Sequence, residues 1–122
     1  AAMRGPWASN PLFEFSFSKP GIREAAEIIN RDFPGAEYLA TQRDRIERDW
    51  TAPERLPEID VATAVIAGDC ETPGFRAYAE EAAAGIPGAR IEFFENCGHL
   101  LPLEEPARVA QTIIEVVRLG GG

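Results

Sequence analysis

The feature that most constrains the fold is the apolar run VATAVIAG at residues 61–68. It is rich in β-branched residues and is bounded by polar segments on both sides. A continuous apolar run of this length is typical of a strand that is buried on both faces, as in a parallel sheet covered by helices. Parallel strands need a long crossover, usually a helix, so the run predicts an α/β fold.

The residues that follow predict a strand–helix–strand–helix order over residues 60–119. Thr72-Pro73 is typical of a helix N-cap with proline at the first helical position, and this helix ends at a PG turn. ARIEFFE predicts the second strand, and Pro106 begins the last helix. We expect a right-handed βαβ unit with a covering helix. The predicted apolar face of that helix comprises Val109, Ala110, Ile113, Val116 and Val117.

The segment LFEFSFS alternates Phe13, Phe15 and Phe17 with polar residues. Alternation with period 2 predicts a short, half-buried strand. The alternative is a loop that places the aromatic rings in a pocket. As a functional hypothesis, the three rings line an acyl pocket or a lid, but we favour strand packing.

Two helices are predicted between this segment and the apolar run. GIREAAEIINRDF has apolar residues at helical spacing, and AEYLATQRDRIERDW is apolar at Leu39, Ile46 and Trp50. Its charge-rich part, QRDRIERD, is predicted to be a solvated helix face. Pro53 and Pro57 predict an extended connector.

The charge of the chain excludes one class of partner. Lys and Arg contribute 12 charges and Asp and Glu contribute 20, so the formal net charge is −8. An acidic surface repels phosphate backbones, so we expect no nucleic acid partner. No apolar run is long enough to span a bilayer, and the start AAMRGPWASNP has no apolar signal-like region. We therefore expect no membrane partner and a cytoplasmic location.

Two polar loops follow the two predicted strands. GDCETP occupies residues 68–73, and ENCGHL occupies residues 95–100 and contains the only histidine, His99. In parallel α/β sheets, catalytic groups lie beyond the carboxyl ends of the strands. An acid of the first loop is therefore expected to accept a hydrogen bond from one ring nitrogen of His99, which leaves the other nitrogen available as a base.

The two cysteines flank these loops and leave several readings open. Cys70 and Cys97 could form a disulfide across adjacent strand ends, or bind zinc together with His99. Cys97 as a nucleophile is disfavoured because it is two residues from His99 on the same loop. We favour two small, semi-buried thiols.

Residues 53–119 resemble the C-terminal half of an α/β-hydrolase-fold protein. The resemblance rests on the strand, the G-D-x-acid-T-P turn, the IPGAR segment, the GH pair and the P-x-E-x-P helix start. In that family the turn supplies the acid of a catalytic triad and the GH pair supplies its histidine. The resemblance assigns these roles to Glu71 and His99, which are 28 residues apart. The family usually has Asp where this chain has Glu71, so Asp69 is a second candidate for the acid.

The same resemblance implies a nucleophilic serine on a G-x-S-x-G elbow, upstream of the acid. The chain has three serines, Ser9, Ser16 and Ser18, and none has glycine two residues before and two after. The first strands of such a sheet are missing as well. The chain therefore carries an acid and a base without a nucleophile.

These features predict a single α/β chain with three parts. Residues 1–52 form a lead-in strand or loop and lid-like helices, residues 53–119 form the hydrolase half, and residues 120–122 form a glycine tail. We expect the acid/base half of a serine-type hydrolase for ester, amide or related bonds, inactive alone and without a cofactor. The alternative is a non-catalytic binding or oligomerisation module. Two strands alone leave unpaired edges, so we expect that the chain does not stand alone. It either forms a homo-oligomer, or pairs with a complementary chain that also completes a small-molecule substrate site, or is a piece cut from a longer protein.

Overall fold

The computed structural model describes residues 9–33 and 52–121. It confirms the predicted order in the second half: β1 (Ala64–Gly68), α6 (Pro73–Gly85), β2 (Arg90–Phe94) and α8 (Pro106–Gly120). The two strands are parallel, and the register places Gly68 opposite Phe94 at their carboxyl ends. Over the described residues the sheet contains these two strands alone, so the α/β fold has an open, incomplete sheet.

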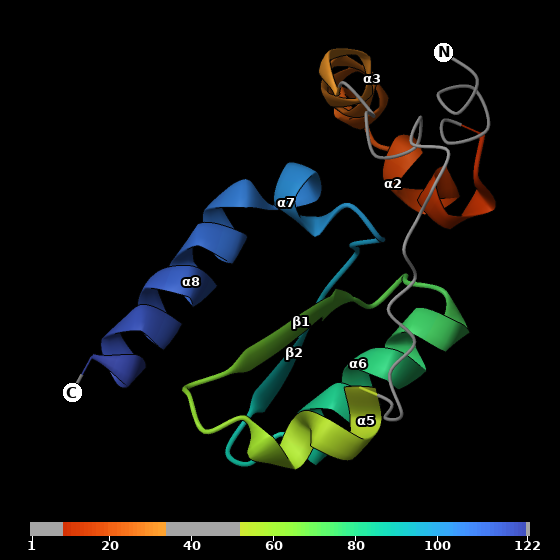
Figure 1. Cartoon of the computed structure of the whole chain (residues 1–122). Helices are drawn as coiled ribbons and strands as arrows, with labels where there is room; N and C mark the ends of the chain where they lie inside the picture. The colour runs from red at the N-terminus through yellow and green to blue at the C-terminus, as the bar shows by residue number, and fades with distance from the viewer. Residues whose placement is uncertain (1–8, 34–51, 122) are drawn as a thin grey trace, which may run out of the picture.

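Helices lie on both sides of the sheet (Figure 1). α6 and the short helix α5 (Ala52–Arg55) lie on one side, and α8 lies on the other. The N-terminal helices α2 (Glu14–Phe17) and α3 (Ile22–Asp32) lie beyond the carboxyl ends of the strands, near α7 (Leu101–Glu104). This arrangement brings the start of the described chain to the sheet edge where both polar loops lie.

The best-buried cluster lies at the end of β2. Phe94 and Cys97 are fully buried, and Leu101 packs with them. Ile66 of β1 and Val109 of α8 complete this cluster from two further elements. Packed apolar side chains therefore anchor both ends of the loop that carries His99.

The predicted strand at Phe13, Phe15 and Phe17 is wrong. The segment forms a 3-10 turn, η1 (Pro11–Phe13), followed by α2. The Asn10 side chain accepts a hydrogen bond from the Leu12 amide at 3.0 Å, so it caps the turn locally. Proline at the start of the turn fixes a helical φ, and together these local signals outweigh the alternation. Phe13 is buried, while Phe15 and Phe17 are half-buried.

The predicted extended connector is also wrong. It forms α5 and a 3-10 turn, η2 (Leu56–Glu58), and Pro53 and Pro57 lie in the first turns of these elements. Proline is compatible with a first helical turn because the missing N–H has no intrahelical partner there. The helix predicted over residues 21–33 is confirmed as α3. The helix predicted over residues 36–50 lies outside the described residues.

The predicted apolar face of α8 is only partly covered. Val109 and Val116 are half-buried, but Ile113 and Val117 are 57% and 67% exposed. Thr112, which the sequence pattern did not indicate, is the buried residue of this helix. In the part of the chain that the structure describes, no helix is both long enough and apolar enough to cross a bilayer.

Candidate functional site

The two polar loops are joined by backbone hydrogen bonds at the carboxyl ends of the strands. The Asp69 amide donates to the Phe94 carbonyl at 3.0 Å, and the Cys70 amide donates to the Cys97 carbonyl at 2.9 Å. Gly68 permits this approach, since a Cβ atom there would lie 2.0 Å from the Cys97 carbonyl oxygen. The loops therefore lie side by side, as the parallel topology predicts.

Glu71 and His99 form the closest polar contact between these loops. His99 Nδ1 lies 2.6 Å from Glu71 Oε2. The Glu71 side chain is 6% exposed and the His99 side chain is 25% exposed. An ionised carboxylate can only accept a hydrogen bond, so this contact favours the neutral tautomer in which Nδ1 carries the proton and Nε2 keeps a lone pair. The pair has the geometry of an oriented base that solvent or a substrate can reach.

The start of α6 stabilises the Glu71 carboxylate. Its second oxygen, Oε1, accepts a hydrogen bond from the Thr72 amide at 2.8 Å. The partial positive charge of a helix N-terminus favours an anion at this position. Thr72 occupies the predicted N-cap position, but its side chain makes no capping hydrogen bond. The short GDCETP turn thus places the Glu71 carboxylate between the Thr72 amide and the His99 ring.

Asp69, the second predicted acid, has a different set of contacts. Its Oδ1 accepts a hydrogen bond from the Cys97 amide at 3.2 Å. The hydrogen bond from the Cys70 thiol lowers the pKa of Asp69, and the backbone amides of Cys97 and Asn96 add to this effect against the opposing effect of burial. The structure thus brings Asp69 to the opposite loop's backbone, and Glu71 to His99.

Two phenylalanines lie beside the imidazole of His99. The Phe75 ring meets it edge-on, with centroids 4.7 Å apart, and the Phe13 ring lies 5.6 Å away. Phe13 comes from η1 and Phe75 from the first turn of α6. Phe13 is buried, whereas Phe75 is 43% exposed. His99 therefore sits in a partly apolar environment that opens on the Phe75 side.

A buried carboxylate behind His99 was not predicted as a site residue. Glu104 accepts hydrogen bonds from Ser16 Oγ at 2.6 Å and from the Gly98 and Leu100 amides. Lys19 Nζ lies 3.0 Å from it. The sequence marked Glu104 only as the glutamate of the P-x-E-x-P motif. Its partners Ser16 and Lys19 could not be predicted, because they are far away along the chain.

Opposing effects set the pKa values of this cluster. Burial alone would raise the pKa of Glu104, but the hydrogen bonds from Ser16 and Gly98 and the contact with Lys19 lower it below 4.5. Burial would lower the pKa of Lys19, and Glu104 outweighs it, so that this pKa is raised above 10.5. Both groups are therefore charged at neutral pH.

Comparison with known protein families supports the α/β fold described above. The sequence model described as "Alpha/beta hydrolase family" matches residues 1–112. The chain belongs to the alpha/beta hydrolase family. The match includes the N-terminal part, where the sequence pattern offered no motif. No curated protein and no solved structure matches the chain.

In this α/β-hydrolase chain, two serine hydroxyls have other partners than His99. Ser16 Oγ donates to Glu104, and Ser18 Oγ donates to the Phe15 carbonyl at 2.6 Å. Ser16 is fully buried. Neither hydroxyl hydrogen is directed to the imidazole.

The cysteines of the α/β-hydrolase chain are free thiols, Cys70 exposed and Cys97 buried. The hydrogen bond to Asp69 raises the pKa of Cys70, and burial raises that of Cys97. Both shifts disfavour the reactive thiolate. Over the described residues, no group of three or more His, Cys, Asp or Glu side chains could hold a metal ion.

Proposed function

We propose that this chain is the acid/base half of a serine-type hydrolase that acts on an ester, amide or related bond. The observation that carries the proposal is the 2.6 Å contact of His99 Nδ1 with Glu71 Oε2, at the sheet edge where α/β proteins bind ligands. The nucleophilic serine is supplied by residues outside these 122, in a second chain or in a longer form of this one. The proposed reaction requires no cofactor.

In this proposal His99 moves the proton. Nε2 of His99 accepts the proton of the attacking serine and later donates it to the leaving group. Glu71 keeps the other ring proton on Nδ1 and stabilises the imidazolium as it forms. Phe75 and Phe13 border the imidazole, and we propose that an apolar part of the substrate lies against Phe75.

The test is turnover of a chromogenic ester by an assembly that also contains the G-x-S-x-G half, fused or co-expressed. His99→Ala is expected to lower kcat on the order of 10⁶-fold and Glu71→Gln on the order of 10⁴-fold, the losses typical of removing a triad base and a triad acid. Glu80→Gln is the matched control, because it makes the same change from carboxylate to amide at an exposed position of α6. It is expected to leave turnover unchanged. Undiminished turnover in His99→Ala would overturn the proposal.

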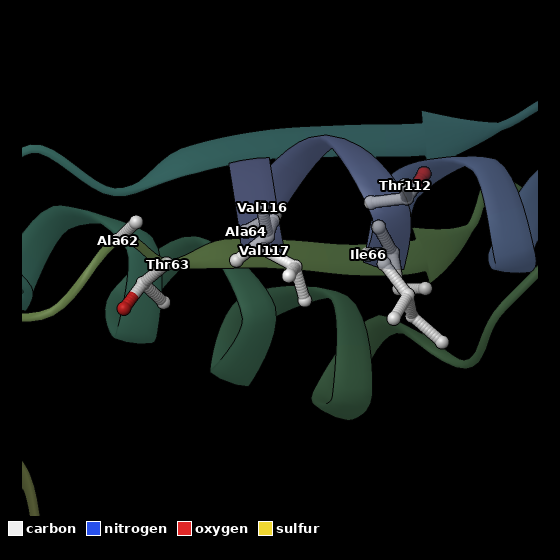
Figure 2. A pocket seen from close by; sticks show the side chains of 8 residues that line it. Ala62, Thr63, Ala64, Ile66, Thr112, Val116 and Val117 are labelled. Carbon is white, nitrogen blue, oxygen red and sulfur yellow. The ribbon is translucent and has the colours of Figure 1, made fainter. Parts of the chain in front are cut away.

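A second candidate, a non-catalytic binding or oligomerisation module, is favoured by one observation. A groove of about 310 Å³ lies between β1 and α8, next to the strand edge that pairs with no described strand. Figure 2 shows side chains from both elements facing this groove. Its walls are mostly apolar: Ala62, Thr63, Ala64, Ile66, Thr112, Ile113, Val116 and Val117. Stable association without turnover in the completed assembly would favour this candidate.

A further inference from the structure

We infer that Glu104 is a positioning residue for His99, and that through it residues 16–19 of the N-terminal segment become part of the His99 site. The inference rests on the proposed function only for the catalytic role of His99. The geometric claim concerns how the loop is held, and it can be tested without turnover.

The Glu104 carboxylate contacts the backbone on both sides of His99. Its Oε2 accepts from the Gly98 amide at 3.0 Å, and its Oε1 accepts from the Leu100 amide at 3.1 Å. The side chain of Glu104 is 0% exposed. Hydrogen bonds to a charged, buried acceptor are stronger than those between neutral groups. Glu104 therefore holds the His99–Leu100 peptide unit, directly after His99, and the Cys97–Gly98 peptide unit, one unit before it.

Glu71 and Glu104 hold His99 in complementary ways. Glu71 contacts Nδ1 of the ring, while Glu104 contacts only backbone atoms of the flanking residues. The ring can keep its 2.6 Å contact only where the backbone places it in reach. Loss of the backbone contacts is therefore expected to weaken the contact between the ring and Glu71 as well.

The N-terminal segment provides the partners that allow this carboxylate to be buried. Ser16 Oγ donates to Glu104 and also accepts from the Leu100 amide at 3.2 Å. Lys19 balances the charge at 3.0 Å. A buried carboxylate without such partners would be strongly destabilising. The segment before α3 is thereby connected to the His99 loop across 88 residues of sequence.

A purely local role for Glu104 explains only one of these contacts. Glu104 ends α7, and its bond to the Leu100 amide resembles helix capping. Gly98 precedes this helix by three residues, and Ser16 belongs to another element. The set of contacts surrounds His99 and extends beyond the start of α7.

The experiment uses the whole chain with labelled histidine, because His99 is the only histidine and gives a single set of ring signals. The ring ¹⁵N shifts, at a pH where the ring is neutral, report which nitrogen carries the proton. Amide exchange of Gly98 and Leu100 reports the backbone contacts. The variants are Glu104→Gln and Glu104→Ala, with Glu105→Gln as a control that removes the same charge at the adjacent, exposed position.

In the wild type we expect the proton on Nδ1. In Glu104→Ala we expect exchange of both amides to be faster by about 10–100-fold, as for lost hydrogen bonds to a charged acceptor. We also expect a mixture of the two ring tautomers. Glu104→Gln should be intermediate, because its amide oxygen still accepts, and Glu105→Gln should match the wild type. A folded Glu104→Ala chain with wild-type exchange and tautomer would overturn the inference.

A milder variant covers the case in which Glu104→Ala does not fold. Ser16→Ala removes one donor to Glu104 and one acceptor for Leu100. Unchanged exchange of Leu100 in both Ser16→Ala and Glu104→Gln would also overturn the inference. These outcomes are independent of the proposed function, which fails instead when His99→Ala retains turnover in the completed assembly.

Discussion

At the scale of single residues, Asp69 and Glu71 show how the backbone separates two acids that are two positions apart. The Asp69 carboxylate accepts a hydrogen bond from the Cys97 amide and helps to hold the two loops together. Glu71 lies two residues before α6 begins, and its side chain reaches His99. The sequence made both acids candidates because both belong to the same turn. Only the contacts of their oxygens distinguish their roles.

The pH dependence of stability is predicted to report on Glu104. Its pKa is lowered in the folded state, so the unfolded chain binds more protons at acidic pH, and stability rises with pH there. The contribution of Glu104 is present above about pH 5.5 and is lost as the pH falls through 4.5 and below. The measurement is the urea midpoint of the wild type and of Glu104→Gln from acidic to neutral pH.

The two midpoints should differ at neutral pH and converge as the medium becomes acidic, because protonation makes Glu104 resemble Gln. Glu105→Gln serves as the control and should follow the wild type at every pH. A difference between wild type and Glu104→Gln that stays constant over the whole acidic range would contradict this assignment.

Glu104 is a residue whose contacts could not be predicted from the sequence. The contact between His99 and Glu71 could be predicted because each residue follows a recognisable strand at its carboxyl end. The contacts of Glu104 with Ser16 and Lys19 join residues that are 88 and 85 positions apart in the sequence (104 − 16 and 104 − 19). No local pattern encodes such a contact.

At the scale of elements, the predictions succeeded where long-range and local signals agreed. For β1 and β2 the apolar runs predict buried strands, and for α6 and α8 the prolines mark the helix starts, so the two kinds of signal give one consistent order of elements. For the segment with Phe13, Phe15 and Phe17 they conflict. Alternation favoured a strand, but Asn10 and Pro11 begin a helical turn, and no described strand pairs with the segment.

The contact between β1 and the His99 loop gives an element-scale prediction. A Cβ atom on Gly68 would lie 2.0 Å from the Cys97 carbonyl oxygen and 2.6 Å from that of Gly98, and backbone cannot move aside as a flexible side chain can. Gly68→Ala is expected to lower the free energy of unfolding by at least about 1–3 kcal/mol, the cost of overpacking. Urea denaturation measures it.

Gly74→Ala is the matched control, because nothing lies within 4 Å of the added methyl group in the first turn of α6. It should be neutral or stabilising by up to about 1 kcal/mol, since alanine favours the helix. Equal stability of the Gly68→Ala and wild-type chains would show that the loops do not approach as described.

At the scale of the whole molecule, the open sheet is the feature that the sequence predicted best. Two strands have helices on both sides, but Ile113, Val117 and Leu119 of α8 remain 57%, 67% and 70% exposed. Exposed apolar surface of this kind marks interaction sites. We therefore propose that a second chain, another copy or a further segment of a longer protein covers it.

The central proposal is that these 122 residues supply the acid and the base of a hydrolase but not its nucleophile. Intact mass spectrometry after treatment with a fluorophosphonate serine probe tests it most directly. The account predicts an unmodified mass for the chain alone, since Ser16 and Ser18 direct their hydroxyl hydrogens elsewhere. A single adduct that disappears in His99→Ala would contradict the account, because a nucleophile activated by His99 would then lie within this chain.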